Sequence, residues 1–318
     1  MTQDEQQMRA VTQDAAGGVE VLRVHDVARP KPGPTEVLVR VRAAGVNPAD
    51  WKTRAGGSFM SGEAPPFTLG WDVAGEVVAV GRGVTLHSPG DAVFGMPRFP
   101  HPAEAYAEYV VSPARHLAPR PAGMSWEEAG GLPLAGLTAW QALVDTAGVE
   151  QGQRVLVHAG SGGVGHLAVQ IAKARGAYVI ATASAANHET VLRLGADEMI
   201  DYRTQDFADV VRNVDIVLET IGGDNATRSL RTLRPGGTLV SIRPADETFL
   251  IAAAEQAGVA ARVMVVEPDL GGLQQLAALV EQGRLRVLVD SVYDLDHVAE
   301  AHRRGETGRT VGKIVLTP

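Results

Sequence analysis

The chain has 318 residues, with 37 acidic against 29 basic side chains, a formal net charge of −8 and no cysteine. The absence of thiols excludes disulfides, thiolate nucleophiles and zinc sites built on cysteine, and the acidic balance argues against a nucleic-acid partner. No run of 18 apolar residues is present, so no membrane span is expected. Met1–Gln7 lacks the basic start and apolar centre of a signal peptide. With a length that favours two domains, these features predict a cytoplasmic protein.

The first third of the chain has the pattern of a β-rich unit. Short segments of alternating apolar residues are separated by glycines and prolines, as in a partly open barrel or folded sheet. Strands are expected over Val19–Val24, Glu36–Ala43, Gly75–Val80, Asp91–Phe94 and Ala105–Val111.

Helices and strands alternate from about Pro119 onward. Helices are expected over Trp126–Leu132, with Ser125 as its N-cap, and over Thr138–Ala147. The alternation then continues through strands at Val155, Tyr178–Ala183, Met199–Asp201, Val214–Glu219, Thr238–Ile242 and Arg262–Val266, and helices at His166–Ala177, Asn187–Leu194, Asn225–Leu233 and Leu270–Gln282. This order predicts a doubly wound α/β sheet with parallel strands, which binds ligands at their carboxyl ends.

The last stretch contains too few elements for a domain of its own. A strand is expected over Arg286–Val292, a helix over Leu295–Arg304 and an edge strand over Lys313–Leu316. We expect these elements to return to the first unit. The predicted division is therefore 1–118 with 284–318 as a split domain, and 119–283 as an inserted nucleotide domain.

A glycine motif stands between the strand at Val155 and the helix that follows it. Gly160, Gly162 and Gly165 fit G-x-G-x-x-G. The first glycine permits a sharp turn, the second lets backbone approach a pyrophosphate, and the third lets helix and strand pack closely. The N–H groups of Ser161, Gly162, Gly163 and Val164 would then point at phosphates near the positive end of the helix dipole. The motif predicts dinucleotide binding; a plain glycine-rich turn is the alternative.

Four segments together carry a resemblance to a known family. They are Ala44–Asp50, Ala74–Gly81, Leu132–Ala139 and Ala159–Gly165, in this order. In these the chain resembles the medium-chain dehydrogenase/reductase superfamily, and within it the zinc-free, ζ-crystallin-like quinone oxidoreductase and enone reductase branch, over Arg9 to Thr317. The resemblance implies a GroES-like β-rich catalytic domain and a Rossmann nucleotide domain, with a homodimer paired through Arg262–Val266.

Two departures separate the chain from the zinc alcohol dehydrogenases that it also resembles. Those enzymes have cysteine where Asn47 stands and His-Glu in place of Trp71-Asp72, so the resemblance implies no metal site. Alcohol oxidation would then lack its Lewis acid. Reduction of a quinone or a polarised C=C bond needs less, because charge spreads to an oxygen that hydrogen-bond donors can stabilise.

The second strand of the nucleotide domain informs the choice of cofactor. It is followed by Ser184-Ala185-Ala186-Asn187, with no acid before Glu189, whereas an acid here takes the ribose 2′-hydroxyl of NAD. NADPH is therefore expected. The resemblance implies that Ser184 and Tyr202 hold the 2′-phosphate, although Tyr202 is equally a packed strand-end aromatic by spacing alone. The family's basic residue after the serine is absent, and His188 or Arg203 are candidates to replace it.

The resemblance also implies roles near the nicotinamide. Lys52 would stabilise an enolate or deliver a proton, unless it is a solvated surface lysine. Asn47 would bond the substrate or the cofactor ribose, unless it is only a turn residue before Pro48. Further residues expected along the nicotinamide half are Thr138, which can also be a helix N-terminal residue, and Thr220, Ile221, Ser241 and Ile242, which can also belong to ordinary turns.

Three functions remain open on this basis. The first is an NADPH-dependent reductase of quinones or α,β-unsaturated carbonyls. The second is a dedicated enoyl reductase of a biosynthetic, polyketide-like pathway, which differs in substrate-pocket loops such as 54–66 and 98–103. The third is a non-catalytic NADPH-binding protein, which the presence of Lys52, Asn47 and the glycine motif disfavours.

Overall fold

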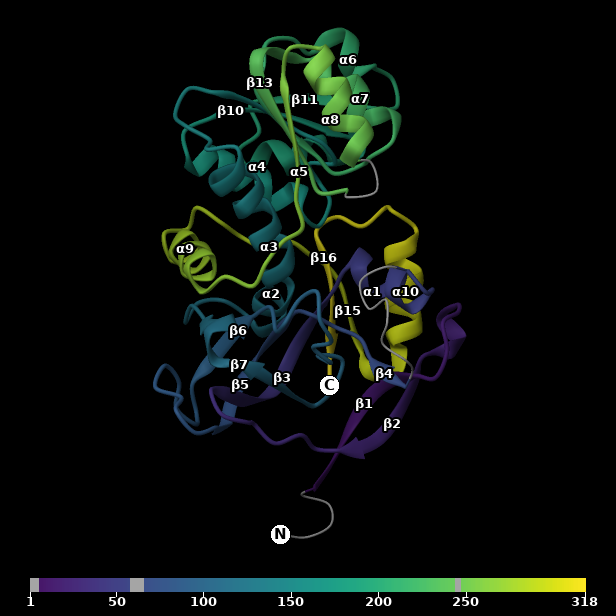
Figure 1. Ribbon diagram of the computed structural model, residues 1–318, viewed down its shortest axis with the longest axis vertical. Helices are drawn as coiled ribbons and strands as arrows, with labels where there is room; N and C mark the ends of the chain where they lie inside the picture. Colours follow the sequence, from purple (N-terminus) through teal and green to yellow (C-terminus); the bar gives the residue numbers. More distant parts are fainter. Residues whose placement is uncertain (1–5, 58–65, 244–246) are drawn as a thin grey trace. The chain divides into compact units, whose positions relative to one another are not determined.

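The computed structural model describes residues 6–57, 66–243 and 247–318 (Figure 1). The chain folds into two compact units. The first comprises residues 1–137, 267–281 and 287–318, and the second comprises 138–266 with 282–286. Of the two predicted substrate loops, residues 58–65 of the loop 54–66 lie outside the described residues.

The first unit is built on a seven-stranded sheet. The strand order is β15 (Val289–Asp294), β16 (Lys313–Thr317), β3 (Glu36–Val46), β5 (Val73–Val80), β6 (Ala92–Gly95) and β8 (Leu117–Pro119), with β7 (Tyr109–Pro113) paired to β3. A smaller sheet has the order β2 (Arg23–Ala28), β1 (Gln7–Gln13) and β4 (Phe67–Thr68). Buried valines of β3 and β5 form much of the core of this unit.

Two strand predictions in this unit are wrong. Lys313–Leu316 is not an edge strand, because β16 lies between β15 and β3, with Ile314 paired to Val46. The strand is buried at every position from Lys313 to Leu316, and its apolar run Ile314–Leu316 is typical of an interior strand. The segment predicted as a strand at Val19–Val24 is a short 3₁₀ helix over Val19–Val21; the strand β2 begins at Arg23.

Two helices, α2 (Trp126–Gly131) and α9 (Leu270–Glu281), pack against the large sheet and so belong to the first unit. α2 begins as predicted: Ser125 Oγ accepts the N–H of Glu128, and Glu128 Oε2 accepts the N–H of Ser125. α2 packs on β3, β5 and β16, and α9 packs on β8. These contacts place both helices in the first unit, whereas the division drawn from sequence put them in the nucleotide domain.

Glu104, a few residues before the strand β7, has an unusual backbone conformation. Glu104 has a φ of +62°, in the left-handed region that glycine adopts without strain. The backbone of the next residues is held by the N–H of Ala105 on the carbonyl of Gly70, at 3.1 Å, and the N–H of Tyr106 on that of Leu69, at 3.0 Å. The regular strand starts only at Tyr109, later than the predicted Ala105.

The second unit is a six-stranded parallel sheet. Its order is β11 (Glu198–Asp201), β10 (Tyr178–Ala183), β9 (Arg154–Val157), β12 (Val214–Glu219), β13 (Leu233–Ser241) and β14 (Ala260–Val263). Within this sheet, β9 comes first along the sequence. The following strands β10 and β11 lie on one side of it, and β12, β13 and β14 lie on its other side. This reversal confirms the predicted doubly wound Rossmann topology, with its switch point beside the glycine motif.

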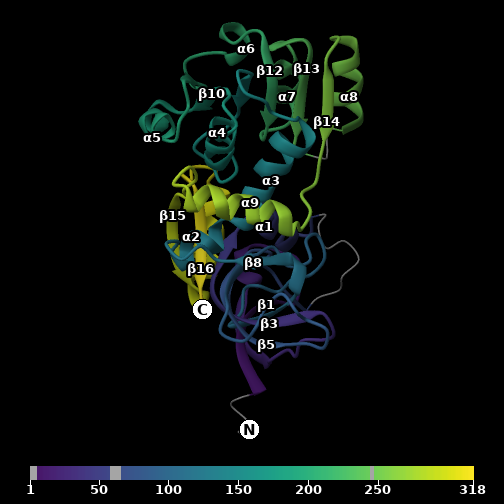
Figure 2. The same ribbon diagram turned by 90° about the vertical axis from the view of Figure 1, so that its left-hand side faces the viewer.

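Helices connect the strands of this sheet. α4 (Gly165–Ala174) packs on β9 and β10, and α7 (Asp224–Leu230) packs on β12 and β13. The connections run in opposite directions from β9, and right-handed connections of this kind place their helices on opposite faces of a sheet. The helices α5 (His188–Arg193), α6 (Phe207–Val210) and α8 (Glu247–Gln256) can be followed with α4 and α7 in Figure 2. Within the described residues, every helix is too short or too polar to cross a bilayer.

The helices α3 and α7 differ from their predicted bounds. α3 begins at Pro133 and ends at Trp140, and a π-helical turn over Gln141–Thr146 continues it. Proline suits the first turn of a helix because it lacks an N–H that would have no partner there. The helix predicted over Asn225–Leu233 ends at Leu230, and Leu233 already belongs to β13.

Candidate active site

Close packing, rather than unusual backbone angles, explains the first and third glycines of the motif, Gly160 and Gly165. A Cβ on Gly165 would lie 2.1 Å from the carbonyl oxygen of Ala159, and one on Gly160 would lie 2.8 Å from the Cβ of Ala181. On Gly162 the nearest atom would be 3.2 Å away. The residue with a left-handed backbone is Ala159, at φ +50°. Gly165 thus lets α4 start against the end of β9, and Gly160 lets the turn approach β10.

The turn presents donors for an anion at the start of α4. The N–H groups of Gly160, Gly162 and His166 are bonded to carbonyls of Thr182, Ala159 and Gly162, at 2.8, 2.8 and 3.0 Å. Within the described chain, the N–H groups of Ser161, Gly163 and Val164 have no hydrogen-bond partner. Backbone donors beside a helix N-terminus form a cradle for phosphate, so this turn fits a pyrophosphate.

The remaining predicted cofactor residues of the second unit lie at the same edge of the sheet. Each stands at the carboxyl end of a parallel strand: Ser184 after β10, Tyr202 after β11, Thr220 and Ile221 after β12, and Ser241 and Ile242 at the end of β13. Contacts join neighbouring ends: Asn187 Nδ2 donates to Ser161 Oγ at 3.1 Å, and the N–H of Ile242 donates to the carbonyl of Glu219 at 3.1 Å. Thr138 stands in the middle of α3 rather than at its N-terminus, and is 5% exposed.

Ser184 and Tyr202 lie beside one another at this edge. Ala183 pairs with Asp201 in the register of β10 and β11, so the residue after each begins the adjoining turns. Tyr202 is 56% exposed, which argues against a packed strand-end aromatic. The guanidinium of Arg203 lies 5.8 Å from the centre of its ring. His188 is turned back to the strand, with Nε2 3.2 Å from the carbonyl of Ala183.

In the first unit, Asn47 belongs to a buried polar cluster. Its Nδ2 donates to Asp72 Oδ2 at 2.8 Å, and its Oδ1 accepts from Lys313 Nζ. Lys313 Nζ lies 3.7 Å from Asp72 Oδ2, and Asp72 Oδ1 accepts the N–H of Leu134 at the start of α3, at 2.6 Å. Asn47, Asp72 and Lys313 are 1%, 0% and 3% exposed. An ammonium and a carboxylate are therefore held in the interior by an amide that bridges them.

Burial shifts the ionisation of this cluster. It raises the pKa of Asp72, which the ammonium of Lys313 opposes, and it lowers the pKa of Lys313, which the carboxylates of Asp72 and Asp50 oppose. Asp50 is fully buried beside them, and burial raises its pKa to about 7. Asp50 nevertheless accepts the N–H of Asn47 at 2.7 Å and that of Gly70 at 3.1 Å. It thereby ties the start of α1 (Pro48–Arg54) to the loop that carries Trp71 and Asp72.

Lys52 is exposed, whereas the other two residues singled out in this region, Asn47 and Trp71, are buried. Lys52 stands on the exposed side of α1, and Asn47 lies at the buried start of the same helix. Trp71 is 1% exposed, and its Nε1 donates to the carbonyl of His101 at 2.8 Å. Its ring packs edge-on against Phe99, with centroids 5.4 Å apart. Trp71, at the sequence position of the ligand histidine in the zinc dehydrogenases that the chain resembles, is thus a buried and hydrogen-bonded core side chain.

The donors around Asp72 do not fit a zinc ion. Zinc in proteins takes cysteine, histidine or carboxylate ligands in a tetrahedron, and within the described residues no group of three or more such side chains could hold a metal. Asp72 instead contacts the amide of Asn47 and the ammonium of Lys313.

Several polar residues of both units were not predicted from sequence. They are Lys313 in the first unit, and His158, Thr182, Glu219, Asn225 and Ser229, which form a hydrogen-bonded group under the carboxyl edge of the second. A signal was available for two of them. His158 and Glu219 each follow an apolar strand run, Val155–Val157 and Ile216–Leu218, where a buried polar side chain requires partners.

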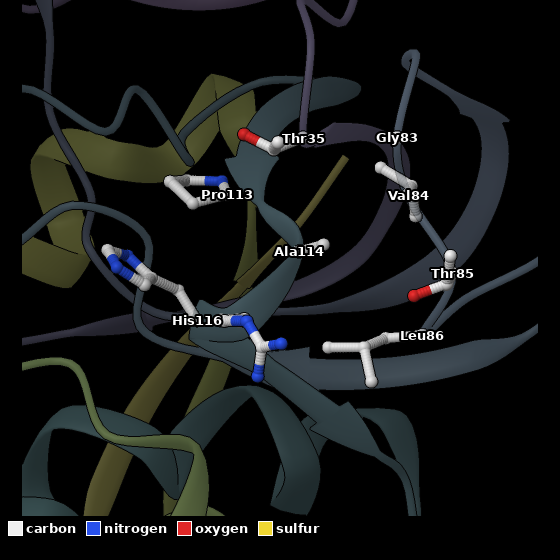
Figure 3. Close-up of a pocket in the computed structure, with 9 residues that line it drawn as sticks. Thr35, Gly83, Val84, Thr85, Leu86, Pro113, Ala114 and His116 are labelled. Carbon is white, nitrogen blue, oxygen red and sulfur yellow. The ribbon is translucent and has the colours of Figure 1, made fainter.

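A surface pocket of about 450 Å³ opens elsewhere on the first unit (Figure 3). Figure 3 shows Thr85 and Leu86 on one wall and Pro113, Ala114 and His116 on the other. None of its lining residues is among the predicted site residues, so it has no part in the proposed chemistry.

Comparison with known proteins places the chain in a family. Residues 33–122 match the model "Alcohol dehydrogenase GroES-like domain", and residues 194–316 match "Zinc-binding dehydrogenase". The chain is 34% identical over 319 residues to the chloroplast envelope quinone oxidoreductase homolog of Arabidopsis thaliana, covering 95% of both chains. It is also 39% identical over 290 residues to the polyketide synthase GfsB of Streptomyces halstedii, covering 89% of this chain and 5% of that one.

Solved structures agree. The quinone oxidoreductase from Coxiella burnetii is similar at a TM-score of 0.93 and 37% identity, over 98% of this chain and 99% of that one. A mycobacterial protein complexed with NADPH is similar at a TM-score of 0.86 and 32% identity, over 98% of this chain and 100% of that one. The fold, the glycine turn and these full-length similarities show that the chain belongs to the medium-chain dehydrogenase/reductase superfamily, in its zinc-free quinone oxidoreductase branch, and is an NAD(P)H oxidoreductase of small molecules.

Proposed function

We propose that the protein is an NADPH-dependent reductase of quinones or of the C=C bond of α,β-unsaturated carbonyls, and that it works without zinc. The proposal includes a cytoplasmic homodimer paired through the outer strand β14. A light-scattering mass near twice the 33.5 kDa of one chain is expected; a monomer would remove that part of the proposal.

The observation that carries the zinc-free chemistry is the cluster of Asn47, Asp72 and Lys313. The cation beside the Asp72 carboxylate is an ammonium of this chain, and the amide of Asn47 is engaged at both ends. Oxidation of an unactivated alcohol needs a Lewis acid at the oxygen. Reduction of a quinone or enone needs a hydride donor and hydrogen-bond donors at the carbonyl oxygen. It needs no metal ion beside Asp72, so the cluster of Asn47, Asp72 and Lys313 is compatible with it. The quinone oxidoreductases among the relatives support the same substrate class.

The edge of the parallel sheet would hold the cofactor. The N–H groups of Ser161, Gly163 and Val164 would bind the pyrophosphate, and the hydroxyls of Ser184 and Tyr202 would bind the 2′-phosphate, with Arg203 nearby. The nicotinamide half would lie along Thr138, Thr220, Ile221, Ser241 and Ile242. When bound, the cofactor supplies a hydride. The similar mycobacterial structure is complexed with NADPH, which supports this choice.

Lys52 and Asn47 have different parts in the proposal. The hydride adds to the electron-poor carbon of the substrate, and the electron pair of the double bond moves to the carbonyl oxygen. Lys52 stabilises the charge on that oxygen or donates the proton that completes the reduction, directly or through water. Because the Asn47 amide already bonds Asp72 and Lys313, we assign Asn47 a positioning role at the start of α1.

Ser184→Asp tests the choice of cofactor. A carboxylate beside the 2′-phosphate would repel it, so we expect kcat/KM for NADPH to fall by about 100-fold, the size of a close like-charge contact in a partly buried site. The value for NADH should stay within about threefold of the native protein or rise. Ser184→Ala removes only the hydroxyl, so its kcat/KM for NADPH should lie between that of the native protein and that of Ser184→Asp. Equal losses with both cofactors in Ser184→Asp would place Ser184 away from the 2′-phosphate.

Lys52→Ala tests the proposed catalytic lysine. We expect kcat to fall by about 10²-fold, the usual contribution of a positioned acid, with the Kd of NADPH unchanged. Lys31→Ala is the matched control, because Lys31 is exposed in a loop of the same unit. Activity equal to that of the control would remove Lys52 from the mechanism.

A second candidate, an enoyl reductase for thioester-bound intermediates, is favoured by the 39% identity to a segment of a polyketide synthase. It uses the same hydride and proton steps on a different carbonyl. Preference for an enoyl thioester over free quinones in kcat/KM would select it. The non-catalytic alternative predicts tight NADPH binding with no turnover of either class.

A further inference from the structure

A buried chain of hydrogen bonds crosses the carboxyl ends of β10, β9 and β12. The N–H of Ala159 donates to Thr182 Oγ1 at 3.1 Å, and Thr182 Oγ1 lies 3.3 Å from His158 Nδ1. His158 Nε2 lies 2.9 Å from Ser229 Oγ, which lies 3.2 Å from Glu219 Oε2. The side chains of Thr182, His158, Ser229 and Glu219 are buried, with Ser229 and Glu219 0% exposed. The chain begins in the glycine turn and ends at the turn after β12.

The partners fix the direction of these bonds. Ser229 Oγ has two neighbours that only accept, the carbonyl of Asn225 at 2.7 Å and the carboxylate of Glu219. Its single proton goes to one of them, so its oxygen accepts from His158, whose Nε2 carries the proton. His158 Nδ1 then accepts from Thr182. Burial lowers the pKa of His158, in keeping with this neutral tautomer.

Glu219 is the end of the chain and the anchor of the turn over residues 220–223. Its Oε1 accepts the N–H groups of Ile221 at 2.5 Å and Gly222 at 2.9 Å, and its Oε2 accepts Asn225 Nδ2 at 2.7 Å. Thr220 Oγ1 donates to the carbonyl of His158 at 3.2 Å. Both successive amides of the turn therefore point at one buried carboxylate, which dictates the path of the backbone and exposes Ile221.

We infer that Glu219 is a positioning residue for the nicotinamide half of the cofactor, acting through the turn over residues 220–223, and that His158 and Ser229 tie that turn to the phosphate-binding glycine turn. The inference rests on the proposed use of this edge for NADPH. A carboxylate suits this role because it only accepts hydrogen bonds, and the N–H groups of Ile221 and Gly222 and the Nδ2 of Asn225 can only donate to it. An amide in its place would direct an N–H at one of these donors.

The test compares binding of the whole cofactor with binding of its adenosine half. In Glu219→Gln we expect calorimetry to show a Kd for 2′,5′-ADP within twofold of the native value. The Kd of NADPH should rise about tenfold and kcat should fall about tenfold, the effect of losing one charged hydrogen bond in a buried group. Ser229→Ala keeps the carboxylate and should raise the Kd of NADPH about threefold. Glu255→Gln, an exposed glutamate of α8, is the control and should match the native protein.

Each other outcome has a definite meaning. Equal weakening of 2′,5′-ADP and NADPH in Glu219→Gln would mean a merely structural carboxylate, and unchanged binding of both with unchanged kcat would mean that the turn does not hold the nicotinamide. If Glu219→Gln does not fold, Ser229→Ala decides between the same results. If the native protein prefers 5′-ADP and NADH, the proposed preference for NADPH is wrong. Comparing the binding of 5′-ADP with that of NADH in Glu219→Gln then still decides the role of Glu219.

Discussion

Replacing Lys313 by methionine is expected to lower the free energy of unfolding by about 3–5 kcal/mol, the cost of removing one partner from a buried ion pair. Methionine has nearly the volume of lysine, so little of the effect comes from a cavity. The loss comes from Asp72, whose carboxylate is 0% exposed and, within the part of the chain that the structure describes, would keep the Nδ2 of Asn47 and the N–H of Leu134 as partners but no cation. Urea denaturation at pH 7 measures it.

Two further variants separate charge from packing in this experiment. Lys313→Met combined with Asp72→Asn removes both charges, and Asn47 can turn its amide toward the amide introduced at position 72. At least half of the stability lost in Lys313→Met alone should therefore return. Lys173→Met removes an exposed pair with Asp197 and should cost less than about 1 kcal/mol. A single variant of Lys313 as stable as Lys173→Met would contradict the assignment of a buried ion pair.

Gly165→Ala is expected to damage the second unit as a whole. The new Cβ would lie 2.1 Å from the carbonyl oxygen of Ala159 and 2.7 Å from its carbonyl carbon, and both are backbone atoms of the turn. They cannot rotate away, so α4 or the end of β9 must shift. We expect a loss of about 3 kcal/mol, at the upper end of the range for overpacking, and loss of NADPH binding. Chemical denaturation and calorimetry measure the two effects.

Gly162→Ala in the same turn should behave differently. Its Cβ would meet the Ala159 oxygen at 3.2 Å, which a shift of a few tenths of an ångström relieves. Stability should fall by less than about 1 kcal/mol, while NADPH binding weakens at least about tenfold, because the second glycine of this motif is where the backbone approaches the proposed pyrophosphate. Equal stability losses in the two variants would refute the distinction between a packing glycine and a ligand glycine.

The fold of the nucleotide unit could be predicted from sequence because its signals are local. The Val-Leu run at Val155, the glycines after it and the repeated change from strand to helix period are each contained in short windows. The parallel order then follows from the rule of right-handed crossovers. The helix before β13 was predicted with wrong bounds because it ends where the chain begins to pair with the sheet. That pairing depends on residues distant in sequence, which a short window does not contain.

The polar cluster of the first unit could not be predicted in this way. Lys313 and Asn47 are 266 positions apart, and Lys313 opens a strand whose apolar run gives no sign of a buried ammonium. The resemblance to the family identified Asn47 and the exchange at Trp71-Asp72, but not the cation that now faces Asp72. The resemblance also implied roles for both Lys52 and Asn47, yet the two residues differ sharply in exposure. Spacing along a short helix does not show which residue is buried.

The most direct test of the proposed function is the steady-state oxidation of NADPH by the native protein, with NADH in parallel. The acceptors are 1,4-benzoquinone, 9,10-phenanthrenequinone, an alkyl enone, a 2-alkenal, an enoyl thioester and a simple ketone. We expect turnover with a quinone or an enone, a higher kcat/KM with NADPH than with NADH, no reduction of the ketone, and no change after treatment with a metal chelator. Reduction of the ketone that the chelator abolishes, or a preference for NADH with every acceptor, would contradict the proposal.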